Sequence, residues 1–585
     1  MRIGIIGGGI SGISAAKVAL SLGHEVLVIE REEKIGGLMS RIANCRVGFQ
    51  TFYNEIKNEP RLKILTGKTI STAERKKDSF LLCLESGENL EVERIVLATG
   101  LTVYEPEIKG KRILSSLEYD RIIDQKNDKL PEDFKRIAFV LCVGSRCKDF
   151  PLCSAVCCSY TLRQIKWTYM RAHPEITVFY NDLRLFGQEF FLEKLLREGG
   201  VRFVRVNSRS FEEDETGVKV RYFTGSTIKE EKFDYLVLTN ALRPNPELKR
   251  LSEMMGFSLN DYGFVKETLP LRTDVYGIFA CGGSLEPMNI KDSILTGLGA
   301  GYLASNGKEA EDGRIYRIRE IPNVLVEDSG KTFVFYVGVR DPYLAAFYEY
   351  FSLKIVELSV KLKEKGKDVY VITRNLIAPS YGELVYEAAR RKGVVFIHLE
   401  EDEKITVSGK RVKIEGGRGI EIDAERIILM EDFVKGLKDF EILGFLRSEP
   451  QLRWSPTKWD NRRFHVGFTR YPRDKRWEGR EYYAACAEIS LEAGGRDVPQ
   501  VIEEKCSGCG SCKNSCVAEA IEVLRIEEIS PLFGPYLVSQ KPFARINSDL
   551  CLGCGLCVST CPSHAIEFSL MKTSMGTRAS QGGLL

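Results

Sequence analysis

The sequence predicts an α/β protein of several domains, followed by a small cysteine-rich α+β segment. An apolar stretch, a glycine turn and a second apolar stretch open the chain, and two short cysteine runs stand near its end. Between them, a set of apolar stretches recurs after about 190–205 residues. At 585 residues the chain is too long for one core, so we expect three or four domains.

Composition excludes several classes of protein. The net charge of +3 gives no basic excess that would indicate nucleic-acid binding. The 17 cysteines gather mainly between Cys142 and Cys158 and between Cys506 and Cys561, which favours ligand clusters over a disulfide framework. Thiolates stay available for metals in a reducing compartment, so we expect a cytoplasmic protein. No stretch of about 18 uncharged apolar residues predicts membrane insertion.

The N-terminus, "RIGIIGGGISGISAAKVALSLGHEVLVIERE", reads as a strand, a glycine turn, a helix, a second strand and an acid. Gly7 allows a tight turn, Gly9 lets the backbone approach a pyrophosphate, and Gly12 lets the helix pack on the strand. Glu30 follows the second strand, where a carboxylate accepts hydrogen bonds from ribose hydroxyls. The complete unit predicts a dinucleotide site, against the alternative of a glycine turn without a ligand.

Three later motifs favour FAD over NAD. The first, "IGG" at Ile35–Gly37, follows the acid, and the second, "RIVLATG", ends a strand. The third, "VYGIFACGG", ends another strand before a helix that starts near Asp292. These motifs resemble those of the thioredoxin-reductase-like flavoprotein superfamily. Where the superfamily usually has Gly-Asp after the late strand, this chain has Gly-Gly. The candidate FAD residues in these motifs are Gly36, Gly37, Ala98, Thr99, Gly100, Gly282 and Gly283.

In that superfamily a second nucleotide-binding domain follows "ATG". Here "RIAFVLCVGSR" keeps only Gly144 of the glycine pattern, so we do not expect bound NAD(P)H. Cysteines stand where the phosphates would lie, and Cys153 and Cys157 share one face if "CSAVCCSYTLRQI" is helical. A four-thiolate iron–sulfur cluster fits best, because the paired CxxC motifs of structural zinc are missing. Small buried cysteines along a helix remain the alternative. The candidate ligands are Cys142, Cys153, Cys157 and Cys158, and Cys147 is a fifth cysteine in a charged loop.

The motifs "CVGSR", "CSAVCC" and "ITVFYNDLRLFG" resemble the A subunit of heterodisulfide reductase and its quinone-interacting relatives. The resemblance covers roughly residues 1–305 and the C-terminal cysteine segment. It implies that Cys142, Cys153, Cys157 and Cys158 bind a [4Fe–4S] cluster near FAD, and that partner subunits reduce a disulfide or sulfur compound or pass electrons toward quinone. The chain departs from longer relatives in lacking their inserted ferredoxin-like domain, and it has Cys45 alone where they are cysteine-rich.

The apolar stretches after residue 331 repeat those of the middle region. "FVFYVGVRD" resembles "FVLCVGSRC", "VYVITRNLI" resembles "ITVFYNDLR", "GVVFI" resembles "GVRFV", "RIILMED" resembles "YLVLTNA", and "YYAAC" resembles "GIFAC". We interpret this as a degenerate copy of the middle domain and of the strand after it. The copy is expected to pack against the first as a pseudo-symmetric partner, replacing a contact between subunits. An independent α/β domain that binds a protein partner is the alternative.

Two CxxCxxCxxxC runs, "CSGCGSCKNSC" and "CLGCGLCVSTCP", predict a ferredoxin domain with two [4Fe–4S] clusters. Each run gives three ligands to one cluster and its last cysteine to the other. Zinc is the weaker alternative, because each run repeats the CxxC spacing more often than a tetrahedral zinc site needs. "AIEVL" and "AIEFS" after the runs predict short strands. The ligand sets are Cys506, Cys509, Cys512 and Cys561 for one cluster, and Cys551, Cys554, Cys557 and Cys516 for the other.

The sequence therefore predicts a cytoplasmic, FAD- and iron–sulfur-dependent oxidoreductase that transfers electrons within a heterodisulfide-reductase-like complex and has no nucleic-acid partner. A homodimer is possible, and no acid–base catalytic residue is assigned. The alternatives are a stand-alone NAD(P)H-dependent reductase and a non-catalytic iron–sulfur scaffold. The predicted domains are 1–135 and 271–310 (FAD-binding), 136–270 (nucleotide-binding-like, with the cysteine cluster), 311–330 (linker), 331–495 (degenerate repeat), 496–571 (ferredoxin) and 572–585 (tail).

Overall fold

The computed structural model describes most of the chain. The described residues are 1–42, 45–108, 110–124, 133–185, 189–206, 208–224, 227–306, 315–316, 329–338, 348–400, 403–416, 419–429, 464–465, 475–492, 499–516, 520–524, 542–547, 551 and 556–567. The predicted linker lies largely outside them, and the predicted tail lies wholly outside. In this part of the chain no helix combines the length and the apolar character that crossing a bilayer requires.

A five-stranded parallel sheet forms the centre of the predicted FAD-binding domain, called the flavin half below, in the order β18-β7-β1-β2-β3. Its strands are buried on both faces, as parallel sheets require. The strands are β1 (Arg2–Ile6), β2 (Glu25–Ile29), β3 (Leu62–Leu65), β7 (Arg94–Leu97) and β18 (Ile278–Ala280). A small antiparallel sheet comprises β4 (Ile70–Arg75), β5 (Phe80–Leu84) and β6 (Asn89–Val92). Short helices η1 (Gly37–Arg41), α2 (Arg46–Asn54), α6 (Glu247–Met255) and η2 (Gly282–Ser284) complete this half.

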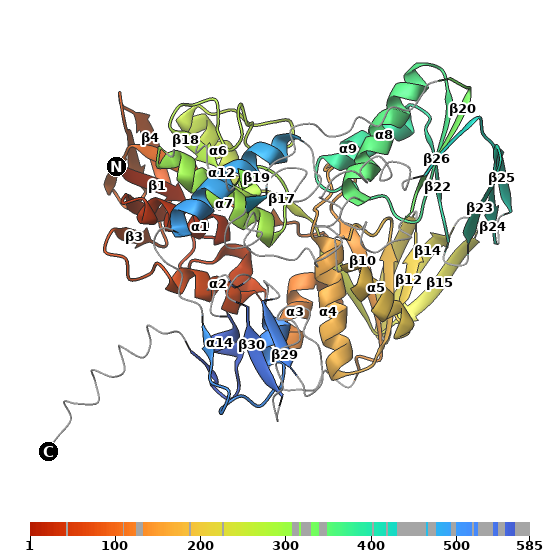
Figure 1. Ribbon diagram of the computed structural model, residues 1–585, viewed down its shortest axis with the longest axis horizontal. Coiled ribbons are helices and arrows are strands. Elements are labelled where there is room, and N and C mark those ends of the chain that lie inside the picture. Colours follow the sequence, from red (N-terminus) through yellow and green to blue (C-terminus); the bar gives the residue numbers. More distant parts are fainter. Residues whose placement is uncertain are drawn as a thin grey trace.

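Three helices pack together beside this sheet: α1 (Ile10–Ser21), α7 (Ile290–Ala304) and α12 (Lys475–Glu492) (Figure 1). Glycines let α7 approach both neighbours closely. A Cβ on Gly297 would lie 2.3 Å from the Ser11 carbonyl oxygen of α1, and one on Gly299 would lie 3.3 Å from the Tyr483 Cβ of α12. Helix α12 thus belongs to the core of the flavin half, although the sequence places it after the repeat.

The middle domain has a second parallel sheet, in the order β12-β11-β10-β16-β9. Because β9 belongs to this sheet, the domain reaches back to Ile113, ahead of the predicted start at residue 136. Its strands are β9 (Ile113–Ser115), β10 (Arg136–Val143), β11 (Glu175–Tyr180), β12 (Arg202–Arg205) and β16 (Tyr235–Asn240). A separate β-meander consists of β13 (Ser208–Asp214), β14 (Gly217–Thr224) and β15 (Thr227–Phe233). Its helices are α3 (Ser116–Asp124), α4 (Cys157–Arg171) and α5 (Glu189–Glu198), and β8 (Leu101–Val103) pairs with β17 (Leu242–Pro244) where the two halves meet.

The predicted repeat has the same topology as the middle domain. Its parallel sheet runs β22-β21-β20-β26, matching β12-β11-β10-β16, and a three-stranded meander again precedes the last strand. The elements are β20 (Thr332–Val337), α8 (Tyr348–Glu364), β21 (Asp368–Thr373), α9 (Gly382–Arg391), β22 (Val395–His398), β23 (Lys404–Ser408), β24 (Arg411–Glu415), β25 (Ile420–Asp423) and β26 (Arg426–Leu429). Two further short strands, β19 (Ile315–Tyr316) and β27 (Phe464–His465), pair in parallel.

The last predicted strand of the repeat, "YYAAC" at Tyr482–Cys486, is wrong: it lies inside helix α12. Its apolar character reflects burial and not strand formation. Alanine favours helices, and the small side chains at Ala484 and Ala487 fit against the glycine-containing helix α7.

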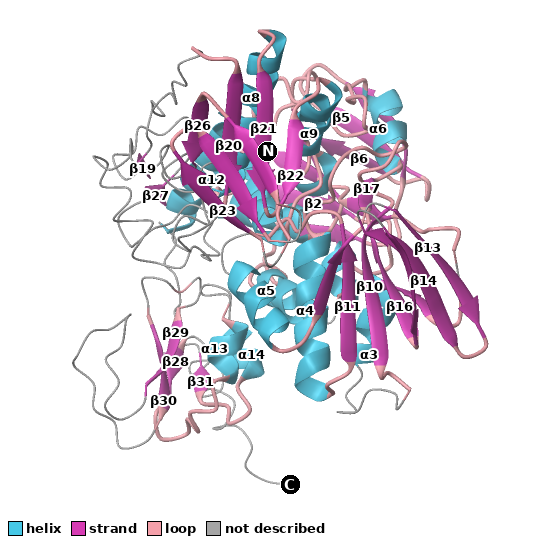
Figure 2. Cartoon of the chain, turned by 90° about the vertical axis from the view of Figure 1, so that its right-hand side faces the viewer, coloured by secondary structure: helices cyan, strands magenta, loops and turns pink. Residues whose placement is uncertain are grey.

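The middle domain and the repeat lie side by side (Figures 1 and 2). Phe190 at the start of α5 packs edge-on against Tyr348 at the start of α8, with ring centroids 5.9 Å apart. In the equivalent place of the other copy, Glu383 at the start of α9 reaches Arg146 in the loop before α4. Each copy therefore contacts the other through the start of its second helix, α5 or α9.

The C-terminal cysteine segment forms a small α+β unit next to α2 (Figure 1). Its antiparallel pairs are β28 (Gln500–Val501) with β31 (Ile566–Glu567) and β29 (Ile521–Leu524) with β30 (Phe543–Ile546). Strands β29 and β31 confirm the two strands predicted after the cysteine runs. The short helices α13 (Ser511–Ser515) and α14 (Leu556–Thr560) carry the third cysteine of each run.

Candidate functional site

The N-terminal glycine turn has three different steric environments. Gly7 has φ +109°, and a Cβ there would lie 2.2 Å from the Ala98 carbonyl oxygen. A Cβ on Gly12 would lie 2.1 Å from the Gly7 carbonyl oxygen, so this glycine lets α1 pack against the turn. A Cβ on Gly9 would meet nothing within 4 Å. Gly9 is the N-cap of α1 and faces a cavity, which is the space that a close-lying pyrophosphate needs.

Glu30 directly follows β2 and is 8% exposed. Its Oε2 accepts a hydrogen bond from the Gly8 amide (2.8 Å) and its Oε1 accepts one from the Glu32 amide (2.9 Å). These bonds fix the carboxylate at the cavity wall. A carboxylate offers about four lone-pair positions, so both oxygens can also accept from ribose hydroxyls.

One cavity of 1210 Å³ extends from the glycine turn into the middle domain. This exceeds the ~300–1,000 Å³ of ordinary small-molecule pockets, as an elongated dinucleotide requires. Gly282 and Gly12 do not line it; the Gly282 amide donates to the Thr296 hydroxyl (2.9 Å) and the residue packs against Ser11. The predicted residues that line the cavity are Gly7, Gly9, Glu30, Gly36, Gly37, Ala98, Thr99, Gly100 and Gly283.

The N-terminus of α7 faces the same cavity. The Asn289 side chain caps this helix by accepting from the Asp292 amide (2.9 Å). Ile290, Lys291 and Ser293, in the first turn, line the cavity. The positive end of a helix of this length favours negative charge nearby, as on the pyrimidine portion of a reduced flavin. The helix predicted to start near Asp292 is confirmed, two residues earlier.

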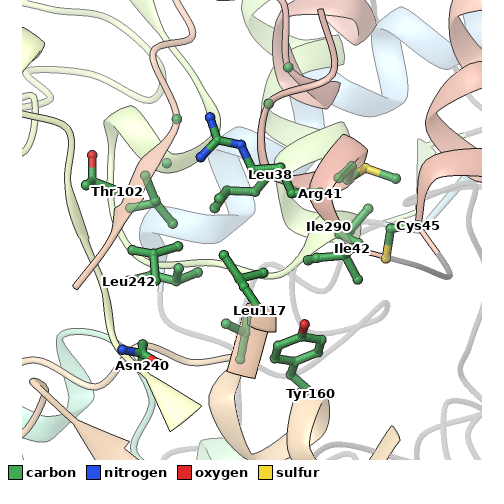
Figure 3. A pocket seen from close by; sticks show the side chains of 18 of the residues that line it. Leu38, Arg41, Ile42, Cys45, Thr102, Leu117, Tyr160, Asn240, Leu242 and Ile290 are labelled. Atoms are coloured by element: carbon green, nitrogen blue, oxygen red, sulfur yellow. The ribbon is translucent and has the colours of Figure 1, made fainter. Parts of the chain in front are cut away.

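Side chains from three parts of the chain enclose the far end of the cavity (Figure 3). Arg41 and Cys45 come from the segment before α2, Thr102 and Leu242 from the paired strands β8 and β17, and Tyr160 from α4. Sequence motifs assigned none of these residues to the site. No local pattern could have identified them, because they meet only when the two halves pack together.

The middle-domain cysteines lie where β10 ends and α4 begins. Helix α4 starts at Cys157, so Cys153 lies in the preceding loop and the two do not share a helical face, contrary to the conditional prediction. The reason is Ala155, whose φ of +60° is not helical. Cys142 (φ +61°) and Arg146 (φ +54°) also have left-handed backbones. Such strain in non-glycine residues persists only where surrounding structure enforces it, and it concentrates at functional sites.

These four cysteines are close to one another and largely buried. Cys153, Cys157 and Cys158 are buried, and Cys157 lines the flavin cavity. A hydrogen bond with Cys157, together with burial, raises the pKa of Cys142, and burial raises the pKa of Cys153. Thiols of this kind release their protons when a metal binds. Cys147, by contrast, is exposed.

Arginines surround the four thiols. Arg146 and Arg184 are 7% and 1% exposed at their side chains, and both are within electrostatic reach of Cys153. Among the described residues, the Nη1 of Arg146 and the Nε of Arg184 have no hydrogen-bond partner. Arg209 donates to the Leu141 carbonyl oxygen (2.5 Å) beside Cys142. Arg146 and Arg184 already pair with the carboxylates of Asp182 and Glu383, and their remaining donors fit a further anion such as an iron–sulfur cluster.

In the described part of the chain, no three His, Cys, Asp or Glu side chains are arranged to hold a single metal ion. This is true of the ferredoxin cysteines as well as the middle-domain ones.

The place of a second nucleotide, beyond β10, is filled by protein. A Cβ on Gly144 would lie 2.1 Å from the Tyr104 ring. Arg243 stacks over that ring, 4.1 Å from its centroid, and donates two hydrogen bonds to the Gly144 carbonyl oxygen (3.1 and 2.8 Å). Backbone amides here cannot approach a pyrophosphate.

In the ferredoxin unit the first predicted ligand set comes together. Cys512 is within electrostatic reach of Cys506, Cys509 and Cys561, and burial raises the pKa of Cys512 to about 11. Of the second set, Cys516 packs with Cys551, and Cys557 lies on α14. Cys554 lies outside the described residues.

The two halves of this unit repeat each other at their cysteine sulfurs. The Ala520 amide donates to the Cys516 sulfur and the Ala565 amide donates to the Cys561 sulfur, both at 3.2 Å. Amide hydrogen bonds to sulfur are one way in which proteins adjust cluster potentials.

The pyridine nucleotide-disulphide oxidoreductase model matches residues 1–297, more than half of the chain. The chain belongs to the pyridine nucleotide-disulphide oxidoreductase family. It is an oxidoreductase with a flavoprotein fold, and FAD is its flavin cofactor. A 4Fe-4S dicluster domain model matches residues 505–565, so this member of the family also carries [4Fe–4S] clusters.

The chain is similar to the A subunits of heterodisulfide reductases. It is 29% identical to the iron-sulfur A subunit of the CoB–CoM heterodisulfide reductase of Methanocaldococcus jannaschii over 262 residues, 40% of each chain. It is 28% identical to the A subunit of the H₂/formate:CoB–CoM heterodisulfide,ferredoxin reductase of Methanococcus maripaludis over 289 residues, 45% of this chain and 43% of that one. The chain thus matches about two fifths of the length of these relatives.

Among solved structures, the thioredoxin reductase of T. acidophilum matches 52% of this chain and 96% of its own, with 17% identity and a TM-score of 0.41. The NAD-dependent persulfide reductase of A. fulgidus matches 53% of this chain and 59% of its own, with 18% identity and a TM-score of 0.37.

Proposed function

We propose that this oxidoreductase is the FAD- and iron–sulfur-containing electron-transfer subunit of a heterodisulfide-reductase-like complex. One observation carries the proposal: Cys157 of the middle-domain cysteine group and the glycine turn at Gly9 line the same cavity. We further infer that Cys142, Cys153, Cys157 and Cys158 hold a third [4Fe–4S] cluster, since buried arginines with free donors face them.

FAD, when bound, supplies the ability to accept an electron pair and to release electrons singly. The chain's own residues position and isolate it. Gly9 leaves room for the pyrophosphate, Glu30 is held ready for the ribose, and the α7 N-terminus favours negative charge on the ring. Leu117 and Tyr160 line the far end of the cavity (Figure 3).

Two routes would lead electrons away from this cavity. One begins at Cys157, where the middle-domain cluster would be held. The other passes α2, which contacts α14 of the ferredoxin unit and whose N-cap, Cys45, lines the cavity. Such a branch suits a subunit that connects two different redox partners.

The partners and location follow from the relatives and are part of the proposal. The proteins named above are subunits of heterodisulfide reductases, so we infer partner subunits that reduce a disulfide or sulfur compound or pass electrons toward quinone. A cytoplasmic location agrees with this role, and a homodimer is compatible with it. We assign no acid–base catalytic residue.

Cofactor content of the full chain, purified without oxygen, tests the proposal. Three four-iron clusters predict about twelve iron atoms for one FAD. The Cys157→Ser variant should keep FAD and fall to about eight iron atoms. Cys147→Ser is the matched control, because that thiol is exposed in the same loop, and it should keep all the iron. A wild-type chain with only eight iron atoms, or equal loss in both variants, would overturn the third cluster.

A further inference from the structure

The segment Ala378–Glu383 of the repeat, which ends in the first turn of α9, forms a wall of the middle-domain cysteine group. Its Ser380 carbonyl oxygen accepts from the Cys153 amide (3.3 Å). Its Ala378 carbonyl oxygen accepts from the Arg184 guanidinium. The Glu383 carboxylate pairs with Arg146 (3.1 Å) and also with Arg184. The two arginines that face the thiols are therefore held from the repeat.

The same segment also contacts the flavin half, through Ser380. The Ser380 hydroxyl donates to Glu286 (2.7 Å), which pairs with Arg480 of α12 (2.6 Å). Ser380 itself has a left-handed backbone, with φ +49°. Of the seven described non-glycine residues with positive φ, four border this one site: Cys142, Arg146, Ala155 and Ser380.

Charge in this wall is nearly balanced by two carboxylates. Arg146, Arg184 and Arg205 surround Asp182, which pairs with Arg146 (2.7 Å) and Arg205 (3.1 Å). Burial alone would raise the pKa of Asp182, but the neighbouring charged groups, among them these three arginines, lower it. Glu383 supplies the second negative charge.

His398 of the repeat also faces Asp182, and 3.4 Å separates the His398 Nδ1 from the Asp182 Oδ1. Burial lowers the pKa of His398 to about 4, although Asp182 opposes the shift. The imidazole is therefore neutral at pH 7. Three guanidinium groups then face two carboxylates, and of these two only Glu383 comes from the repeat.

We propose that the repeat has kept a redox role despite losing its cysteines: Glu383 holds Arg146 and Arg184 against the middle-domain cluster and sets its reduction potential. This inference rests on the third cluster proposed above. Reduction adds a negative charge to the cluster. The buried Glu383 carboxylate, which pairs with the two arginines beside the cluster, disfavours the added negative charge. The low effective dielectric of a buried site keeps this electrostatic effect large. Removing the charge at position 383 should make reduction easier.

Glu383→Gln tests this in the full-length protein with all cofactors. We expect the equilibrium constant for one-electron reduction of the middle-domain cluster to rise at least about tenfold, which is a shift of about +59 mV. The measurement is a potentiometric titration followed by electron paramagnetic resonance. The ferredoxin clusters, in a separate domain, serve as internal references and should not shift.

Glu387→Gln is the matched control, since Glu387 lies one turn further along α9 and pairs with the exposed Arg391 (2.6 Å). It should leave every potential unchanged. An unshifted middle cluster in Glu383→Gln, or an equal shift in both variants, would refute the role of Glu383.

A second variant covers the case in which Glu383→Gln fails to fold. The Asn375 Oδ1 accepts from the Leu183 amide and from Arg205, both at 3.1 Å, so Asn375→Asp keeps both acceptor contacts and adds one negative charge. It should lower the middle-cluster potential, and a rise or no change would count against the inference. Absence of the third cluster from the wild-type chain would defeat the proposed function and this inference together, whereas an unmoved potential defeats this inference alone.

Discussion

Gly9 and Gly12 stand three residues apart, and the space beside them differs sharply. A methyl group on Gly12 would collide with the Gly7 carbonyl oxygen, whereas one on Gly9 would enter the flavin cavity without touching protein. The same type of residue thus serves packing at one position and ligand access at the other.

Gly9→Ala should therefore fold and lose FAD. We expect the affinity for FAD to fall at least about tenfold, or ~1.4 kcal/mol, because the added Cβ occupies the place of the pyrophosphate. The ratio of flavin to protein absorbance measures this, and circular dichroism checks the fold. Gly12→Ala, by comparison, should lose secondary structure as well. Full flavin content in Gly9→Ala would mean that the pyrophosphate lies elsewhere.

At the scale of elements, helix α12 joins the flavin half to the wall around the cysteines. Arg480 on this helix is 2% exposed and forms ion pairs with Glu267 (3.1 Å) and Glu286 (2.6 Å). Glu286 in turn holds Ser380 of the repeat. One guanidinium group therefore connects three parts of the chain.

Arg480→Met should destabilise the protein by about 3–5 kcal/mol, because it leaves the buried Glu286 and the partly buried Glu267 without their cation. Urea unfolding of the holoprotein, followed by flavin fluorescence, measures the change. Arg411→Met removes an exposed partner of Asp423 and should shift the midpoint little. Similar midpoints for the two variants would show that the buried pairs contribute no more than a surface pair.

Local patterns predicted some elements well and others not at all. The glycine turn at Gly7–Gly12 and the CxxC rhythm from Cys506 identify their structures because each needs only neighbours in sequence. The repeat was visible because strands recur in order. Helix α12 was misread as a strand, and Arg146, Glu383 and Tyr160 were not assigned, because their roles depend on partners far away in the chain.

At the scale of the whole molecule, the two halves of the family fold have diverged in function. The FAD half keeps its glycine turn and cavity, while the corresponding turn of the middle domain is filled by Tyr104 and Arg243. We therefore expect one nucleotide site where the family fold offers two.

We expect NADH and NADPH, each at millimolar concentration, to leave the flavin oxidised under anaerobic conditions, while dithionite reduces it fully. The Tyr104 ring and the Arg243 guanidinium exclude the pyrophosphate of a nicotinamide nucleotide. Flavin absorbance in a stopped-flow instrument measures this, and an authentic NADH-dependent flavoprotein is the control. Rapid bleaching by NADH would favour the stand-alone reductase instead.

The glycines of α7 bear on how a ribosome makes this protein. A helix with Gly297, Gly299 and Gly301 in it has low intrinsic stability, at a cost of about 1 kcal/mol for each glycine relative to alanine. Its neighbour α1 emerges early, but its neighbour α12 emerges only after the entire repeat has been synthesised. In the nascent chain, one side of α7 therefore stays without its packing partner until residue 492 has left the exit tunnel.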